Sequence, residues 1–169
     1  PIRVPGRSRA EVPVIIEVPG RALLAAHTGE SLHLELYAYA TDTQLRVRDF
    51  FSQNLTLELP KLRASLEASG IKYYGTVTLP PGTFWMKVLV RNADTGRTGL
   101  SIVPVTVPEP GGAEPFVLAP LFHEAPGRWI MVKGAPRANA PAYPFVAGGE
   151  SFIPSAAPSV EGGQSARVS

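Results

Sequence analysis

The 169-residue chain contains no cysteine. Disulfide frameworks, thiolate zinc sites, iron–sulfur clusters and cysteine nucleophiles are therefore excluded. The chain also lacks any run of eighteen apolar residues, so we expect no membrane-spanning helix. It has no run of five Lys or Arg residues, and its net charge is only +2. These two features argue against a nucleic-acid-binding surface.

The common signatures of catalysis and metal binding are missing as well. The sequence has no G-x-S-x-G elbow, no Asp-rich calcium loop and no glycine-rich phosphate loop after a strand. Its three histidines are His27, His33 and His123, and none has a ligand partner four residues away. His33 and Glu35 share one strand face, where we expect a surface pair, because zinc requires three or four ligands. We expect no metal and no cofactor.

One motif has a catalytic precedent. Asp94-Thr95-Gly96 is the tripeptide that carries the catalytic carboxylate of aspartic proteases, but those enzymes need two carboxylates and this chain has one copy. Asn92, Asp94 and Gly96 are turn-forming residues, and Gly96 and Gly99 can adopt a positive φ. The segment therefore predicts the polar tip of a hairpin, and we expect no enzymatic activity.

Alternating apolar residues predict about seven short strands in the first 108 residues. Pro13 indicates an edge position, because proline cannot donate to a ladder. We expect a bulge near Ser52, and either a bulge or an edge position near Pro104. One short helix is predicted from Pro60 to Gly70. This pattern favours an all-β fold, an immunoglobulin-like antiparallel β-sandwich.

The composition predicts three parts: an N-terminal extension (1–9), the sandwich (10–108) and a C-terminal arm (109–169). The arm holds nine Pro and eight Gly among its 61 residues, which is typical of extended structure. Apolar segments such as "RWIMVK" and "YPFV" interrupt it. We therefore expect an extended arm with short strands that packs on the sandwich or on a partner.

Surface aromatic residues are the best candidates for an interaction surface. Tyr37, Tyr39, Tyr74 and Trp85 all fall on the non-core faces of their strands. Such residues form either a sugar-stacking platform or a protein interface. The arm's own Trp129 and Phe145 favour cover by the arm or by a partner protein over carbohydrate binding.

The segment "LPPGTFWMKVLVRNADTGRTG" resembles the pattern LPPG-Y-x-L-R-V-x-V-R-[ND]-x-x-T-G-R-x-G. This pattern occurs in the C-terminal region of bacterial secreted proteins related to von Willebrand factor A domains, of the acidobacterial type. The matching positions are Leu79, Pro80, Pro81, Gly82, Val88, Val90, Arg91, Thr95, Gly96, Arg97 and Gly99. "EVPVIIEVPG", "LELYAYA", "RVRDFF" and "YPFVAGGESFIPSAAP" are similar to other parts of that region. The D-x-S-x-S metal motif of the A domain itself is absent, so the resemblance implies no metal site.

The resemblance implies an exported bacterial protein with an adhesion or assembly role and no catalysis in this region. The chain begins with Pro1 rather than Met, so we expect a mature product or a fragment. Our leading expectation is a non-catalytic interaction module that binds other protein chains, copies of itself included. A surface-fibre subunit assembled by strand donation is its specific form, because a Pro-containing edge strand suits such pairing. The alternative is a carbohydrate-binding module.

Overall fold

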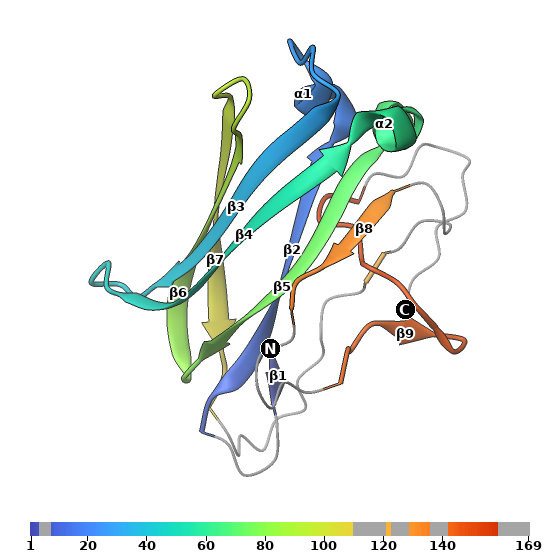
Figure 1. Cartoon of the computed structure of the whole chain (residues 1–169). Helices are drawn as coiled ribbons and strands as arrows, with labels where there is room; N and C mark the ends of the chain where they lie inside the picture. Colours follow the sequence, from blue (N-terminus) through green and yellow to red (C-terminus); the bar gives the residue numbers. More distant parts are fainter. Residues whose placement is uncertain (4–7, 110–120, 123–128, 136–141, 159–169) are drawn as a thin grey trace.

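The computed structural model describes residues 1–3, 8–109, 121–122, 129–135 and 142–158. Two four-stranded sheets pack face to face, and two short helices lie at one end of the sandwich (Figure 1). The first sheet has the order β1 (Ile2–Arg3), β2 (Ala10–Pro19), β5 (Gly70–Leu79) and β8 (Ile130–Lys133). The second has the order β4 (Val47–Glu58), β3 (Ser31–Thr41), β6 (Gly82–Asn92) and β7 (Thr98–Val107). The predicted all-β sandwich is confirmed.

The pairing is antiparallel except at one edge, where β8 runs parallel to β5. A small hairpin of β9 (Val146–Ala147) and β10 (Glu150–Ser151) lies outside both sheets. Pro104 lies on the edge strand β7, as predicted, and the β6–β7 register runs through it without a bulge. The bulge expected near Ser52 is wrong, because Ser52 pairs regularly with Tyr37, and the register shifts instead between Ala40 and Thr41.

Two helices are present where one was expected. The predicted helix is α2 (Leu59–Ala68), with Pro60 in its first turn and Gly70 after its end at φ 147°. The additional α1 (Gly20–Leu24) has only five residues, so it carries no helical periodicity that a sequence pattern could show. It packs closely on α2, since a Cβ on Gly20 would lie 1.7 Å from the Leu66 carbonyl oxygen.

The core lies between the two sheets and consists of the alternating apolar residues. Fully buried side chains include Leu32, Leu34, Leu36, Leu59, Leu66, Ile71, Val77 and Leu79. Each stabilises the fold by about 1.5–3 kcal/mol relative to exposure. The two sheets also contact each other through Phe51 and Tyr73, whose ring centroids lie 5.7 Å apart. Gly75 makes room for this contact, because a Cβ there would lie 2.7 Å from the Phe51 ring.

Parts of the chain beyond residue 120 lie on the outer face of the first sheet (Figure 1). Beside β5, the strand β8 extends that sheet. Further along, the Ser155 hydroxyl and the Ala156 N–H donate to the Glu17 carboxylate, at 3.3 and 2.9 Å. These contacts join positions almost 140 residues apart in the sequence.

Candidate functional site

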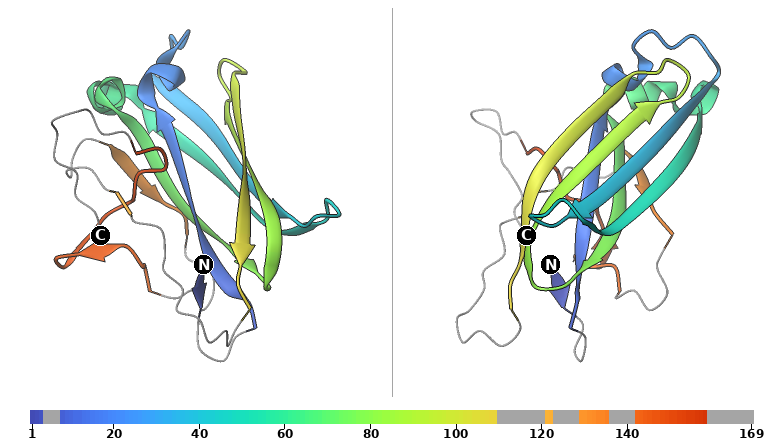
Figure 2. Two further views of the ribbon diagram at one scale, coloured as in Figure 1. Left: turned by 180° about the vertical axis from the view of Figure 1, so that it is seen from behind. Right: turned by 90° about the vertical axis from the view of Figure 1, so that its left-hand side faces the viewer.

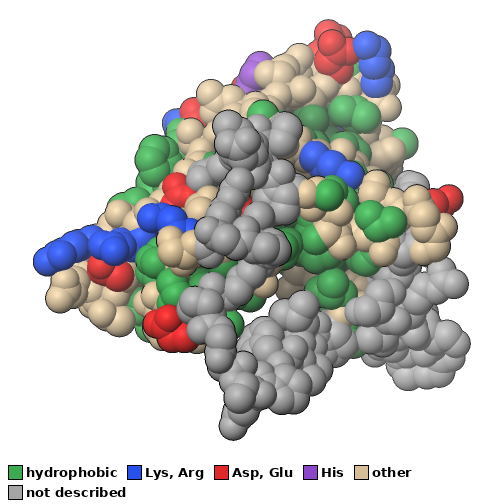
Figure 3. Space-filling model, turned by 90° about the horizontal axis from the view of Figure 1, so that it is seen from below, with side chains coloured by type: hydrophobic (Ala, Val, Ile, Leu, Met, Phe, Trp, Pro, Cys, Tyr) green, Lys and Arg blue, Asp and Glu red, His purple; other side chains and the backbone are tan. Residues whose placement is uncertain are grey.

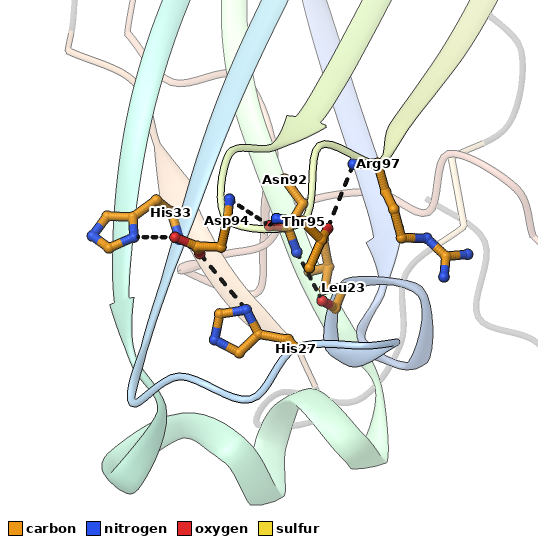
Figure 4. Close-up of polar contacts among 7 residues, drawn as sticks. All are labelled: Leu23, His27, His33, Asn92, Asp94, Thr95 and Arg97. Atoms are coloured by element: carbon orange, nitrogen blue, oxygen red, sulfur yellow. Dashed lines mark hydrogen bonds and ion pairs between the residues drawn. The ribbon is translucent and has the colours of Figure 1, made fainter.

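The Asp94-Thr95-Gly96 segment forms the turn between β6 and β7 (Figure 4). The Asn92 side-chain oxygen accepts the Asp94 and Thr95 N–H groups, at 3.0 and 3.1 Å, and the Gly96 N–H donates to the Asn92 carbonyl. Gly96 has φ 72°, so the predicted hairpin tip is confirmed. The positive φ expected at Gly99 is wrong, because Gly99 lies within β7 and pairs with Val90.

The Asp94 carboxylate binds His33 through both of its oxygens. Oδ2 accepts the His33 backbone N–H at 2.8 Å, and Oδ1 lies 2.8 Å from His33 Nδ1. The hydrogen bond from the backbone N–H of His33, followed by that from its ring, lowers the pKa of Asp94. The expected His33–Glu35 pair is wrong, because Glu35 binds Arg91 instead, with its oxygen 3.0 Å from Arg91 Nη1.

His27 completes this polar cluster from the loop that follows α1. Its side chain is only 3% exposed, and its Nδ1 lies 3.6 Å from Asp94 Oδ2 (Figure 4). The buried Nε2 has no hydrogen-bond partner among the described residues. Asn92, at the base of the turn, donates from its side chain to the Leu23 carbonyl at 3.1 Å. Together these contacts fasten the β6–β7 turn to the α1–β3 connection.

The cluster of His27, His33 and Asp94 has the geometry of a structural clasp. An aspartic-protease site needs a second carboxylate that shares a proton with the first, whereas both neighbours of Asp94 here are imidazoles. Within the described part of the chain, no group of three or more His, Asp and Glu side chains is arranged to hold a metal ion. Asp94 therefore links the β6–β7 turn to the start of β3 and to the loop that precedes it.

The outer face of the second sheet carries a group of exposed apolar side chains. The right panel of Figure 2 looks onto this face, with β7, β6, β3 and β4 side by side. The register places one row of Phe50, Tyr39, Lys87 and Ile102 beside a second row of Ser52, Tyr37, Leu89 and Leu100. Trp85 and Pro104 continue the group toward one end. We call the surface of Tyr37, Tyr39, Phe50, Trp85, Leu89, Leu100 and Ile102 the open face.

Several open-face side chains are well exposed: Phe50 by 55%, Trp85 by 42% and Leu100 by 67%. The rings of Tyr37 and Tyr39 are nearly parallel, with centroids 6.4 Å apart, and Tyr39 stacks on Phe50 at 5.9 Å. Viewed from below, hydrophobic side chains reach the surface near the basic residues at the protruding β3–β4 end (Figure 3). A contiguous apolar patch on a sheet face is typical of a binding surface.

The outer face of the first sheet is covered. Tyr74 contacts Tyr143 and Phe145 edge to face, with centroids 4.8 and 5.9 Å away. The ammonium group of Lys72 lies 4.8 Å from the centroid of the Trp129 ring and 3.8 Å from Glu17. Burial raises the pKa of Tyr74, and that of Tyr143 still further. We call this surface the covered face.

The structure therefore divides the six aromatic residues proposed from the sequence. Tyr37, Tyr39 and Trp85 lie on the open face, whereas Tyr74, Trp129 and Phe145 lie on the covered face. Sequence reasoning missed Phe50, Leu89, Leu100 and Ile102. For Phe50 a signal was available, since strict alternation through "RDFFSQ" places Phe51 inside and Phe50 outside. For β7, apolar residues occur on both faces of the strand, so the sequence pattern could not indicate which face is exposed.

No protein-family model matches the chain, and no curated protein sequence matches it significantly. In the described residues, no helix is both long and apolar enough to cross a membrane. The open face is the described surface with the clearest features of a binding site, because large apolar side chains are exposed on it.

Proposed function

We propose that this protein is a non-catalytic interaction module of an exported bacterial protein, and that it binds other protein chains through its open face. The observation that carries this proposal is the contrast in exposure between the two outer sheet faces. The covered face holds its aromatic residues against the chain's own C-terminal part. The open face presents Phe50, Trp85 and Leu100 to solvent.

The chemistry of the open face suits a protein partner. Aromatic and aliphatic side chains surround Lys87 on this face, and aromatic residues are enriched at protein interfaces. Charged groups, including the Glu35–Arg91 pair, adjoin it in the next row of the same sheet face. An apolar patch beside polar residues is the usual anatomy of such a surface.

The strand order supports the immunoglobulin-like assignment. The second sheet, β4-β3-β6-β7, follows the order C′-C-F-G of variable-type immunoglobulin sandwiches, and β1-β2-β5 follows A-B-E. Modules of this kind are frequent in cell-surface proteins. The resemblance of residues 79–99 to exported von Willebrand factor A-related proteins supports export and an assembly role.

A comparison of matched baits tests the proposal. Phe50→Ser and Trp85→Ser would be combined in one variant, and Asn54→Ser and Thr56→Ser, on the polar part of the same face, in a control variant. Exported proteins of the source cells would be passed over wild type and both variants. We expect a defined set of proteins to bind wild type and the control and to be lost from the Phe50/Trp85 variant. Equal retention by all three would contradict the proposal.

Carbohydrate binding is the second candidate, because the rings of Tyr37, Tyr39 and Phe50 are nearly parallel and stack in sequence. Sugar rings stack on such side chains. The three rings also border the exposed hydroxyl group of Ser52 and the amide group of Asn54. A glycan array would show a signal that Tyr39→Ala abolishes. An array without signal, combined with protein retention in the bait comparison, would decide for the protein partner.

A further inference from the structure

The edge strand β7 presents unused backbone groups. The Asn92 N–H donates to the Arg97 carbonyl at 2.8 Å, so this pair is a hydrogen-bonded pair of the β6–β7 ladder. Because hydrogen-bonded and non-hydrogen-bonded pairs alternate, the even-numbered residues of β7 direct their N–H and C=O groups away from β6. Thr98, Leu100 and Ile102 therefore offer a regular donor and acceptor pattern, and no described strand pairs with it.

This edge carries little of the protection that natural sheet edges use. Its ten residues, "TGLSIVPVTV", include no charged side chain. Leu100 and Ile102 are exposed on the open face, and on the inner side Val103 is 47% exposed although its partner Met86 is buried. Pro104 is the one blocking residue, and it lies at an outward-directed position where its missing N–H costs the β6 ladder nothing.

We propose that β7 pairs antiparallel with β7 of a second copy of this chain, with the two-fold axis at Leu100. The two four-stranded sheets would then form one sheet of eight strands. A two-fold axis perpendicular to the sheet keeps both open faces on the same side, so the pairing doubles the surface on which the proposed function rests.

The positions of the free backbone groups select this register. A symmetric pairing can use the free edge only where outward residues face outward residues, and this holds whenever the axis passes through a residue of β7. Among these registers, the axis at Leu100 pairs the most outward residues without placing Pro104 opposite another residue of β7. At Leu100, each Thr98 faces Ile102 of the other copy, and about six backbone hydrogen bonds form. Pro104 then lies opposite Gly96, which is in the turn. At Ser101, by contrast, Pro104 would face Thr98, and at Ile102 it would face Leu100. In either register the carbonyl of the facing residue would lack a backbone donor, because proline has no N–H.

Charge also favours a second copy. The nearest charged residue in sequence is Arg97, just before β7, and in this register it lies opposite Val103 of the other copy. The two Arg97 residues are offset by six positions along the strands, which is about 20 Å. That separation exceeds the screening length of about 8 Å at physiological salt, so the two copies meet without charge repulsion.

Cysteine cross-linking of the whole chain tests the register, because the natural sequence has no cysteine. Leu100→Cys brings two sulfurs to the axis, where paired Cα atoms lie about 5.5 Å apart, within the range of a disulfide. In Ile102→Cys the two Cα atoms are offset by four positions, about 13 Å, which is too far. We expect mild oxidation to give a covalent dimer for L100C and none for I102C. Equal cross-linking of both variants, or of neither, would overturn the register.

Sedimentation equilibrium tests the association itself. Wild type is expected to dimerise with rising concentration, and Ile102→Pro, which removes an outward N–H, to remain monomeric. Thr106→Pro is the matched control, because it removes the same type of N–H beyond the paired segment. Leu100→Lys provides a second monomeric variant, through like charges at the axis, should I102P disturb the strand. A wild type that stays monomeric up to its solubility limit would overturn the pairing. Retention of proteins by the open face of that monomer would leave the proposed function standing.

Discussion

The two outer faces of this sandwich begin from similar sequence and end differently. Each carries outward-facing tyrosine side chains, Tyr37 and Tyr39 on one sheet and Tyr74 on the other. On the first sheet the described C-terminal residues supply Tyr143 and Phe145 as partners. On the second sheet the described ring partners of the tyrosines are one another and Phe50. Outward aromatic residues thus form a surface that other side chains can bury. Residues of the same chain bury it on the first sheet, and we propose that a partner protein buries it on the second.

The largest expected contrast uses one substitution on both faces. Ile153 lies between Phe152, which contacts Phe145, and Ser155, which binds Glu17, and it is 3% exposed. Ile102 on the open face is 50% exposed. Ile153→Ala should lower the free energy of unfolding by about 2–4 kcal/mol, because it leaves a cavity. Ile102→Ala should change it by less than about 0.5 kcal/mol. Urea unfolding followed by tryptophan fluorescence, together with proteolysis of the C-terminal part, measures both. Equal effects would mean that the two faces do not differ in cover.

A smaller contrast compares two carboxylates. Glu17 accepts hydrogen bonds from Ser155 and Ala156 and lies beside the buried Lys72. Glu35 pairs with the exposed Arg91. Glu17→Gln should cost about 1–2 kcal/mol, as expected for weakening hydrogen bonds to a charged group. Glu35→Gln should cost about 0–0.5 kcal/mol. Thermal unfolding of the two variants at one pH provides the comparison, and a larger loss for Glu35→Gln would contradict it.

The smallest effect concerns the clasp beside the open face. The folded-state pKa of Asp94 is lowered from its model-compound value of 3.8, chiefly by the His33 backbone N–H. A lowered pKa means that the ionised carboxylate stabilises the fold above the unfolded-state value, and that this stabilisation is lost as pH falls through the folded-state pKa. Melting temperatures recorded between neutral pH and pH about 3 should therefore fall less steeply for Asp94→Asn than for wild type. Parallel curves would contradict this role.

Much of the fold was predictable because its strands alternate strictly. In β2, β3 and β5 every second residue is apolar, and all but Val18 of these are buried, so the sequence indicated both the strands and their inward faces. Pro104 indicated its edge, because an edge is where a missing N–H is tolerated. The same reasoning was wrong for Pro13, because β2 lies between β1 and β5, although β1 pairs only with the first two residues of β2. The short helix α1 escaped prediction, since its burial depends on the close approach of Gly20 to Leu66 across the fold.

The site was less predictable, because strand parity assigns a side chain to a face but not to a sheet. Tyr74 and Trp85 both point away from the core, yet they lie on opposite outer surfaces. Which surface the C-terminal residues cover depends on β8 joining β5, a parallel pairing that no local pattern encodes. The partnership of Asp94 with His33 likewise joins residues 61 positions apart.

The contacts of Glu17 with Ser155 and Ala156 have a consequence for the order of folding. They close a loop of almost the whole chain, so they form only after residues near the C-terminus have been synthesised. Until these residues pack on the first sheet, Tyr74 lacks its contacts with Tyr143 and Phe145. The covered face is therefore exposed only until residues 142–156 pack on it, whereas the open face remains exposed in the folded chain.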